Sequence, residues 1–216
     1  MPGMPGRTRY FFRRVGDVFP QDSALARVAW SLMAIRSDLT TELGLIGRDD
    51  GELRALFSSE FLGRMYFFRG SLRSLYSAHV QLWSLLCQVV EFHEVAEGCG
   101  RWDEFLEHIS RVHEYADEFR GYRNRFGGHV EGSVAQSLRH ADPDAVVALG
   151  FNEFATLGNE FGEAAFFSAL AAEAGVPQSD EGFEHLLHRM RDASVACLRC
   201  IDLALAIFAT RYPLFR

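Results

Sequence analysis

Apolar residues recur every three or four positions through several long segments of the chain. The clearest case is the stretch 180–210, whose apolar stripe consists of Phe183, Leu187, Met190, Cys197, Ile201, Leu205 and Phe208. This spacing matches the 3.6-residue turn of an α-helix and differs from the alternation that a strand requires. The repeat therefore predicts an all-α chain, with Ser179 or Asp180 as the N-cap of this last helix.

The same repeat predicts two long helices in the first half of the chain. The first begins after Asp22 or Ser23, either of which suits an N-cap, and ends at Gly44. The second covers about 52–97. Its apolar stripe, which we expect to be buried, consists of Met65, Phe68, Leu72, Leu75, Trp83, Leu86 and Val90.

Glycines are expected to interrupt or end the predicted helices, because glycine weakens a helix interior and favours the turn that follows a helix. Gly63 or Gly70 is expected to break the second helix, and Gly98 with Gly100 to end it. A third helix is expected over 102–126, where acidic residues in the first turn suit the helix dipole.

The remaining segments complete the predicted organisation. A short helix is expected over 130–140, an irregular or β-like insert near 145–159, and another helix over 161–174. Residues 1–20, which contain several Pro and Gly, are expected to form a flexible arm, and residues 21–216 a single helical domain. Long helices with short connections predict an up-and-down bundle of four to five main helices.

Composition excludes several classes of function. The chain contains no lysine, so all 22 of its basic residues are arginine, and lysine-dependent chemistry such as a Schiff base or a phosphate-loop lysine is excluded. The net charge of -7 opposes generic nucleic-acid binding, so any RNA contact has to come from a local group of arginines. Two such groups are the N-terminal arginines from Arg7 to Arg14 and the trio Arg120, Arg123 and Arg125.

The expected setting is cytoplasmic. No apolar run approaches the roughly 20 residues that span a bilayer, and no long apolar segment follows the N-terminal arginines as in a signal peptide. The four cysteines are not needed as staples in a chain of this size. Cys197 and Cys200 have the spacing of a metal or redox pair, but both fall in the apolar stripe of the last helix, which favours buried core thiols.

Histidines and arginines elsewhere offer weaker candidates. His185 and His188 share a helix face, and a solvated surface is favoured there over a metal site. His79 lies on or beside the stripe of the second helix. Arg69 and Arg73, upstream of it, either contribute to an anion pocket or extend from the edge of the core into solvent. No metal or cofactor is expected, and the serine-hydrolase, dinucleotide-binding and zinc-protease motifs are absent from the sequence.

One heptapeptide, 123–129, combines groups that suit phosphate chemistry. His129 titrates near neutral pH and is expected to act as general base on a ribose 2′-hydroxyl or as general acid at the leaving oxygen. Arg123 is expected to stabilise charge that develops on the phosphate, and Asn124 to orient the histidine or the phosphate. Arg120 and Arg125 flank these residues as candidate phosphate contacts.

At Arg123, Asn124 and His129 the chain resembles the HEPN superfamily (higher eukaryotes and prokaryotes nucleotide-binding domains), which are helical bundles marked by an arginine, a following polar residue and a histidine a few positions later. The resemblance covers this heptapeptide and, beyond it, only the architecture. It implies a metal-independent endoribonuclease that acts as a homodimer, in a bacterial defence or toxin–antitoxin setting, with an antitoxin or a nucleotidyltransferase-type protein as partner. The chain departs from active members in the Gly127–Gly128 pair before the histidine.

Two other classes of function stay open at the level of sequence. A non-catalytic interaction or scaffold protein would use the long apolar helices to contact a partner. A small-ligand-binding bundle would line a pocket with some of the 19 phenylalanines, although a simple apolar core accounts for them equally well.

Overall fold

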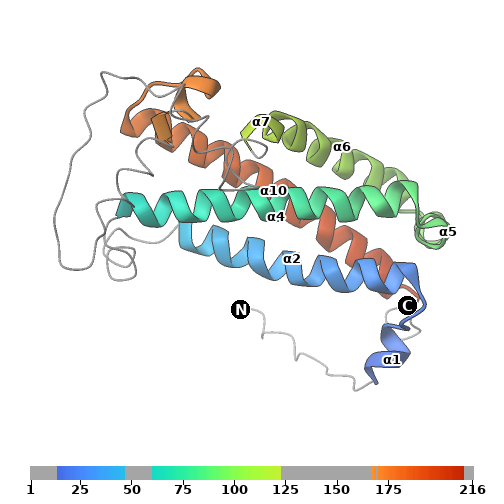
Figure 1. Cartoon of the computed structure of the whole chain (residues 1–216). Helices are drawn as coiled ribbons and strands as arrows, with labels where there is room; N and C mark the ends of the chain where they lie inside the picture. Colours follow the sequence, from blue (N-terminus) through green and yellow to red (C-terminus); the bar gives the residue numbers. More distant parts are fainter. Residues whose placement is uncertain (1–13, 47–59, 123–166, 169, 212–216) are drawn as a thin grey trace, which may run out of the picture.

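The structure, a computed structural model of the whole chain, describes residues 14–46, 60–122, 167–168 and 170–211. Every regular element in these ranges is a helix, which confirms the predicted all-α fold. Four long helices run in alternating directions along the chain, as Figure 1 shows: α2 (Ala24–Ile46), α4 (Glu60–Cys87), α6 (Trp102–Glu118) and α10 (Asp180–Ala209). The described residues thus form the predicted up-and-down bundle.

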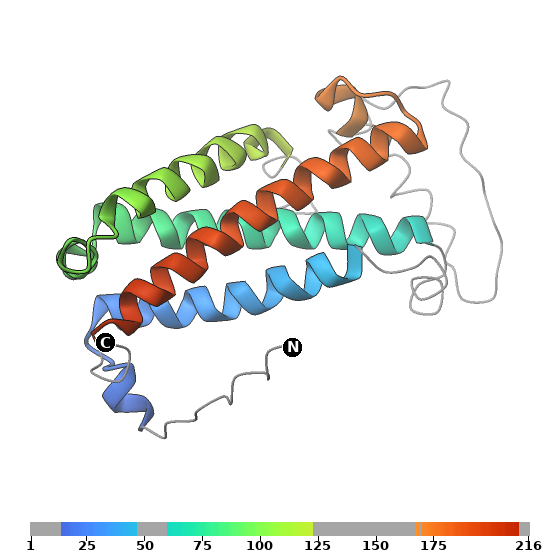
Figure 2. The same ribbon diagram turned by 180° about the vertical axis from the view of Figure 1, so that it is seen from behind.

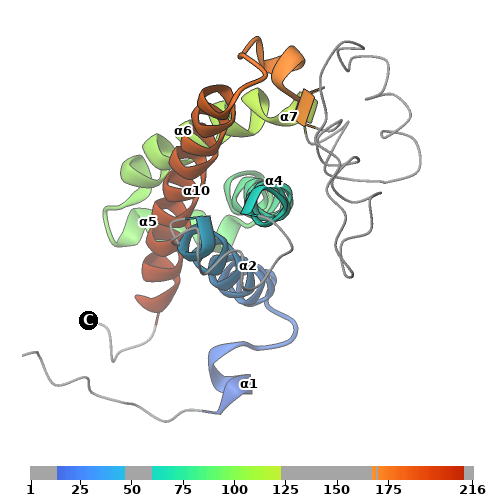
Figure 3. The same ribbon diagram turned by 90° about the vertical axis from the view of Figure 1, so that its left-hand side faces the viewer.

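Three short helices connect or extend the long ones: α1 (Val15–Val18), α5 (Val90–Gly98) and α7 (Arg120–Tyr122). α10 crosses the bundle obliquely and packs against α2, α4 and α6, which is clearest from behind (Figure 2). α4 also contacts each of the other three long helices. Viewed from the side (Figure 3), α2 and α6 therefore flank a central pair made of α4 and α10.

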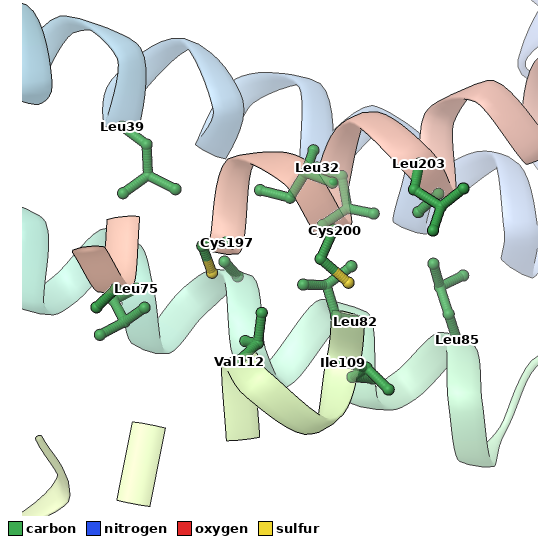
Figure 4. Close-up of a cluster of buried hydrophobic side chains, with 14 of the residues drawn as sticks. Leu32, Leu39, Leu75, Leu82, Leu85, Ile109, Val112, Cys197, Cys200 and Leu203 are labelled. Carbon is green, nitrogen blue, oxygen red and sulfur yellow. The ribbon is translucent and has the colours of Figure 1, made fainter. Parts of the chain in front are cut away.

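The core is mainly apolar and draws side chains from all four long helices (Figure 4). Cys197 and Cys200 of α10 lie at its centre with no exposed surface, which confirms that they are core thiols. Burial raises the pKa of the Cys200 thiol to about 12 and that of Cys197 further still, so both remain protonated and unreactive. Their labelled neighbours in Figure 4 are Leu32, Leu39, Leu75, Leu82, Leu85, Ile109, Val112 and Leu203.

The buried stripe of α4 follows the prediction only as far as Leu75. Beyond that point the predicted Trp83 is 40% exposed and Val90 is 71% exposed. The stripe continues instead through Ala78, Leu82, Leu85, Val89 and Phe92, all of which are buried. The difference arises because the buried stripe steps three residues from Leu75 to Ala78 and then four to Leu82, whereas the prediction went from Leu75 to Trp83. His79 therefore lies at the edge of the core instead of in it.

Several helix ends also differ from the prediction. α4 continues through Gly63 and Gly70, and the chain turns instead at 88–89, which lets Val89 remain in the core as α5 begins. The predicted helix over 102–126 is interrupted at Phe119, which is buried between α6 and α7. In each case the burial of side chains in the core outweighs the local conformational preference of the residues involved.

Other predicted helix ends are confirmed. The Ser23 hydroxyl accepts a hydrogen bond from the Ala26 N–H at 3.1 Å, and the Ser179 hydroxyl accepts one from the Gly182 N–H at 3.3 Å. Gly100, with φ of 68°, ends α5: the Arg101 N–H reaches the Ala96 carbonyl over 2.9 Å, a turn that favours glycine.

The segments flanking the bundle are described in part. Phe19, within the predicted arm, packs against Trp30 and Phe208 with ring centres 5.1 and 5.6 Å apart. The described residues between 167 and 174 are helical, as predicted. Residues 1–13, the expected helix over 130–140 and the expected insert near 145–159 lie outside the described residues. None of the helices among the described residues has the length and apolarity needed to cross a membrane.

The corrected register of α4 predicts opposite results for two nearby substitutions. Leu82→Ala removes a fully buried side chain and should lower the free energy of unfolding by about 2–5 kcal/mol. Val80→Ala, at a residue 41% exposed, should change it by less than about 0.5 kcal/mol. Urea denaturation followed by circular dichroism measures both. Equal losses for the two variants would contradict the register.

Candidate functional site

The structure places one of the five predicted site residues. Arg120 begins α7 and is exposed. The predicted Arg123, Asn124, Arg125 and His129 lie outside the described residues, so their positions stay predictions. Tyr122, at the end of α7, directly precedes this motif, and the surroundings of α7 are therefore the described part of the predicted site.

Core packing and an ion pair hold α7 in place. Phe119 is 2% exposed and its ring lies 5.6 Å from that of Tyr122. Just before it, the carboxylate of Glu118 accepts a hydrogen bond from Arg189 Nε of α10 at 3.1 Å. On the other side, Gly121 lies so close to Glu173 that an added Cβ would come within 2.7 Å of a carboxylate oxygen.

Arg120 lies at the edge of a small cavity between α4 and the junction of α6 and α7. The cavity measures about 210 Å³. Apolar side chains form part of its wall, and the groups able to exchange protons or hydrogen bonds are Tyr76 and His79 of α4, Asp117 of α6 and Arg120. Arg120 forms an ion pair with Asp117, three residues earlier. Because both side chains are about half exposed or more, this pair is weak, and Arg120 can exchange it for another anion at little cost.

His79 is joined to a second histidine, His113 of α6. The distance between His79 Nε2 and His113 Nδ1 is 3.2 Å, within hydrogen-bonding range. The two rings are stacked, with centres 5.4 Å apart. Trp83 stacks on His113 with ring centres 5.0 Å apart, and His113 Nε2 lies 3.5 Å from a carboxylate oxygen of Asp117.

These contacts favour one arrangement of protons. An ionised carboxylate only accepts hydrogen bonds, so Asp117 favours a proton on the nearby Nε2 of His113. Neutral His113 then accepts through Nδ1, and the partner that donates to it is Nε2 of His79. In this arrangement Nδ1 of His79 carries the lone pair of the neutral ring. In this series of contacts, Asp117 orients His113, and His113 orients His79.

The surroundings disfavour a positive charge on His79. Its pKa lies below the ordinary value, chiefly because burial disfavours the charged imidazolium, and also because positive charge on Arg120, or on His113 when that ring is protonated, repels a further charge on His79; together these effects outweigh the attraction of Asp117. A neutral histidine with a free lone pair is a proton acceptor at physiological pH.

A second groove, of about 640 Å³, runs between α2 and α4. Arg69 and Arg73 line it, together with the half-buried Glu42. Burial raises the pKa of Glu42, although the Ser74 hydroxyl donates a hydrogen bond to it at 3.0 Å. The two arginines thus share the groove with carboxylates, which offset their attraction for an anion.

Metal-binding geometry does not emerge from the histidines and cysteines of the described ranges. No group of three or more His, Cys, Asp or Glu side chains within these ranges is arranged to hold a metal ion. His185 and His188 of α10 are exposed, as expected for a solvated helix face.

Sequence reasoning singled out His79 and Arg120 but missed His113, Asp117 and Trp83. The spacing of His113 and Asp117, four residues apart on one helix, was readable as a pair. The sequence does not show that these two residues lie opposite His79, because that position depends on how α6 is rotated against α4.

Comparison with known proteins identifies no relative of this chain. The chain matches no protein-family model, no curated protein and no solved structure. The resemblance to the HEPN superfamily at residues 123–129 therefore stays a prediction.

The lowered pKa of His79 predicts how stability depends on pH. The unfolded chain takes up a proton on this residue near pH 6.5, whereas the folded chain does so only at lower pH. The contribution of His79 is therefore fully present above about pH 6.5 and is lost as the pH falls through the folded pKa. His79→Gln should reduce the loss of stability between pH 7.5 and pH 5 (urea denaturation at each pH).

A matched control exists on α5. His93 lies 3.3 Å from Glu97, four residues later, and packs edge-on against Trp102, but it has no histidine partner among the described residues. His93→Gln should leave the contribution of His79 in place. If His79→Gln retains the full wild-type pH dependence, the stated cause is wrong.

Proposed function

We propose that the chain binds RNA through its phosphates and cleaves it without a metal. Arg123, Asn124 and His129 act on the scissile phosphate, and Arg120 and Arg125 contact phosphates. The supporting observation is that Arg120, just before the motif, borders a cavity lined by His79, whose ring contacts His113, and His113 in turn lies beside Asp117. A cation beside a proton acceptor is the pair that phosphodiester cleavage requires.

Charge supports a local contact over a broad one. The chain carries a net charge of -7, so a nucleic acid is repelled by most of its surface. Arg120 belongs to a short run that also holds Arg123 and Arg125, and its ion pair with Asp117 is exposed and easily exchanged. Phosphates can therefore be held where this run meets the cavity.

The biological setting is part of the same proposal. A metal-independent ribonuclease of this type works as a homodimer in the cytoplasm, in bacterial defence or a toxin–antitoxin pair. An antitoxin or nucleotidyltransferase-type protein would be its partner. These statements rest on the resemblance at residues 123–129 alone.

A non-catalytic interaction protein is the second candidate, favoured by a different observation. Val80 and Trp83 lie on one face of α4 and are 41% and 40% exposed. Exposed apolar side chains grouped on a helix are typical of a surface that meets a partner. Such a protein would have no need for the proton arrangement around His79.

Cleavage is tested by incubating the purified chain, in EDTA, with single-stranded and structured RNA. The wild type should cut, and His129→Ala and Arg123→Ala should each lose at least about 100-fold in rate, as expected for proton transfer and charge stabilisation. Folding of each variant is checked by circular dichroism. Wild-type activity no higher than that of the variants would contradict the proposal and favour the interaction protein.

RNA binding is tested through its dependence on salt. Arg120→Gln should lower the slope of log affinity against log salt concentration by about 0.7, as expected for one phosphate contact on a single strand. Arg101→Gln is the matched control, because Arg101 forms the same kind of exposed pair with Glu104, three residues later, on the first turn of α6. An unchanged slope for Arg120→Gln, or an equal change in both variants, would argue against a contact at Arg120.

A further inference from the structure

The lone pair on His79 Nδ1 gives the cavity a chemical function beyond phosphate binding. His79 lines the cavity, and its other ring nitrogen is engaged with His113 at 3.2 Å. His113 in turn lies 3.5 Å from Asp117. The ring of His79 is thereby held in one orientation and one tautomer, as a general base has to be.

The cavity admits part of a ligand. Its volume of about 210 Å³ is below the range of roughly 300–1,000 Å³ typical of sites that enclose a whole small molecule. Arg120 at the edge supplies a cation suited to a phosphate oxygen. A ribose hydroxyl next to a phosphate presents the two groups, a weak acid and an anion, that His79 and Arg120 complement.

We propose that His79 is a proton-transfer residue for RNA cleavage, and that His113 and Asp117 are positioning residues which fix its tautomer. This inference rests on the proposed function and assigns a second histidine to the same reaction. The substrate class is a ribonucleotide phosphodiester, since the reaction uses its 2′-hydroxyl.

In the proposed step, the lone pair of His79 Nδ1 takes the proton of the 2′-hydroxyl, and the 2′-oxygen forms a bond to phosphorus. The bond between phosphorus and the 5′-oxygen breaks, and that oxygen takes a proton from His129, which acts as the general acid of the proposed function and is reprotonated from water. The products are a 2′,3′-cyclic phosphate and a 5′-hydroxyl, and His79 returns its proton to water.

Electrostatics around His79 gives the proposal a signature. The titratable and charged groups facing it are His113 and Asp117 from α6 and Arg120 from α7, with Tyr76 on its own helix. Asp117 raises the pKa of His79, whereas Arg120 lowers it. Removing the two charges should therefore move the pKa of the base in opposite directions.

The test is a pH profile of kcat/KM for cleavage in EDTA, on the RNA that the wild-type chain cuts. His79→Gln and His79→Ala should each lose at least about 100-fold in rate. Added imidazole should restore part of the activity of His79→Ala, because the smaller side chain leaves room for a free base. His93→Gln serves as the control and should keep the wild-type rate.

The positioning residues are tested in the same profile. The acidic limb of the profile, over which kcat/KM falls as the pH falls, should move to lower pH in Asp117→Asn and to higher pH in Arg120→Gln. Glu97→Gln, which removes the corresponding carboxylate beside His93, should leave the limb unmoved. A purely structural role for these residues would change the rate without moving the limb in opposite directions.

The outcomes separate this inference from the proposed function. If the wild type cuts, His129→Ala is inactive and His79→Gln keeps its activity, the proposed function stands and the role of His79 is overturned. The role is also overturned if His79→Ala is inactive but is not restored by imidazole and the limb does not move in Asp117→Asn. If the wild type cuts no RNA, both are overturned.

Discussion

The packing of α6 against α4 and α10 determines where His113 and Asp117 lie relative to His79. α6 buries a narrow stripe made of Phe105, Ile109 and Val112, and the chain then buries Phe119. Because successive residues of a helix are rotated by about 100°, burying Val112 turns the adjacent His113 towards the edge of α4, where it meets His79 at 3.2 Å. The polar contact between His79 and His113 is therefore a consequence of the burial of Val112 in the apolar core.

The sequence predicts the fold better than the site. Apolar repeats and capping serines predicted α2, α6 and α10, and the two core cysteines followed from their place in a stripe. The failure on α4 has a definite cause, since Ala78 is a weaker apolar signal than Trp83 and the prediction followed the larger side chains. As a result the predicted stripe included the exposed Trp83 and missed the buried Ala78, Leu82 and Leu85, although Leu86 does pack against the core.

The contact between His79 and His113 could not be predicted from the sequence, because it joins residues 34 positions apart across two helices. It depends on the rotation of both helices and on the step at Ala78 that leaves His79 at the edge of the core. Arg120 was predicted as a phosphate contact for its place in an arginine run, and the structure adds that it borders the cavity of His79.

Through His113, Asp117 favours the tautomer of His79 that carries its proton on Nε2 and its lone pair on Nδ1. Long-range ¹H–¹⁵N NMR of the imidazole rings at pH 7.5 measures this directly, because protonated and unprotonated ring nitrogens differ widely in ¹⁵N shift. The account predicts that both histidines carry their proton on Nε2, and that Asp117→Asn loosens this preference. A proton on Nδ1 of His79, or an equal mixture of tautomers in both rings of the wild type, would contradict it.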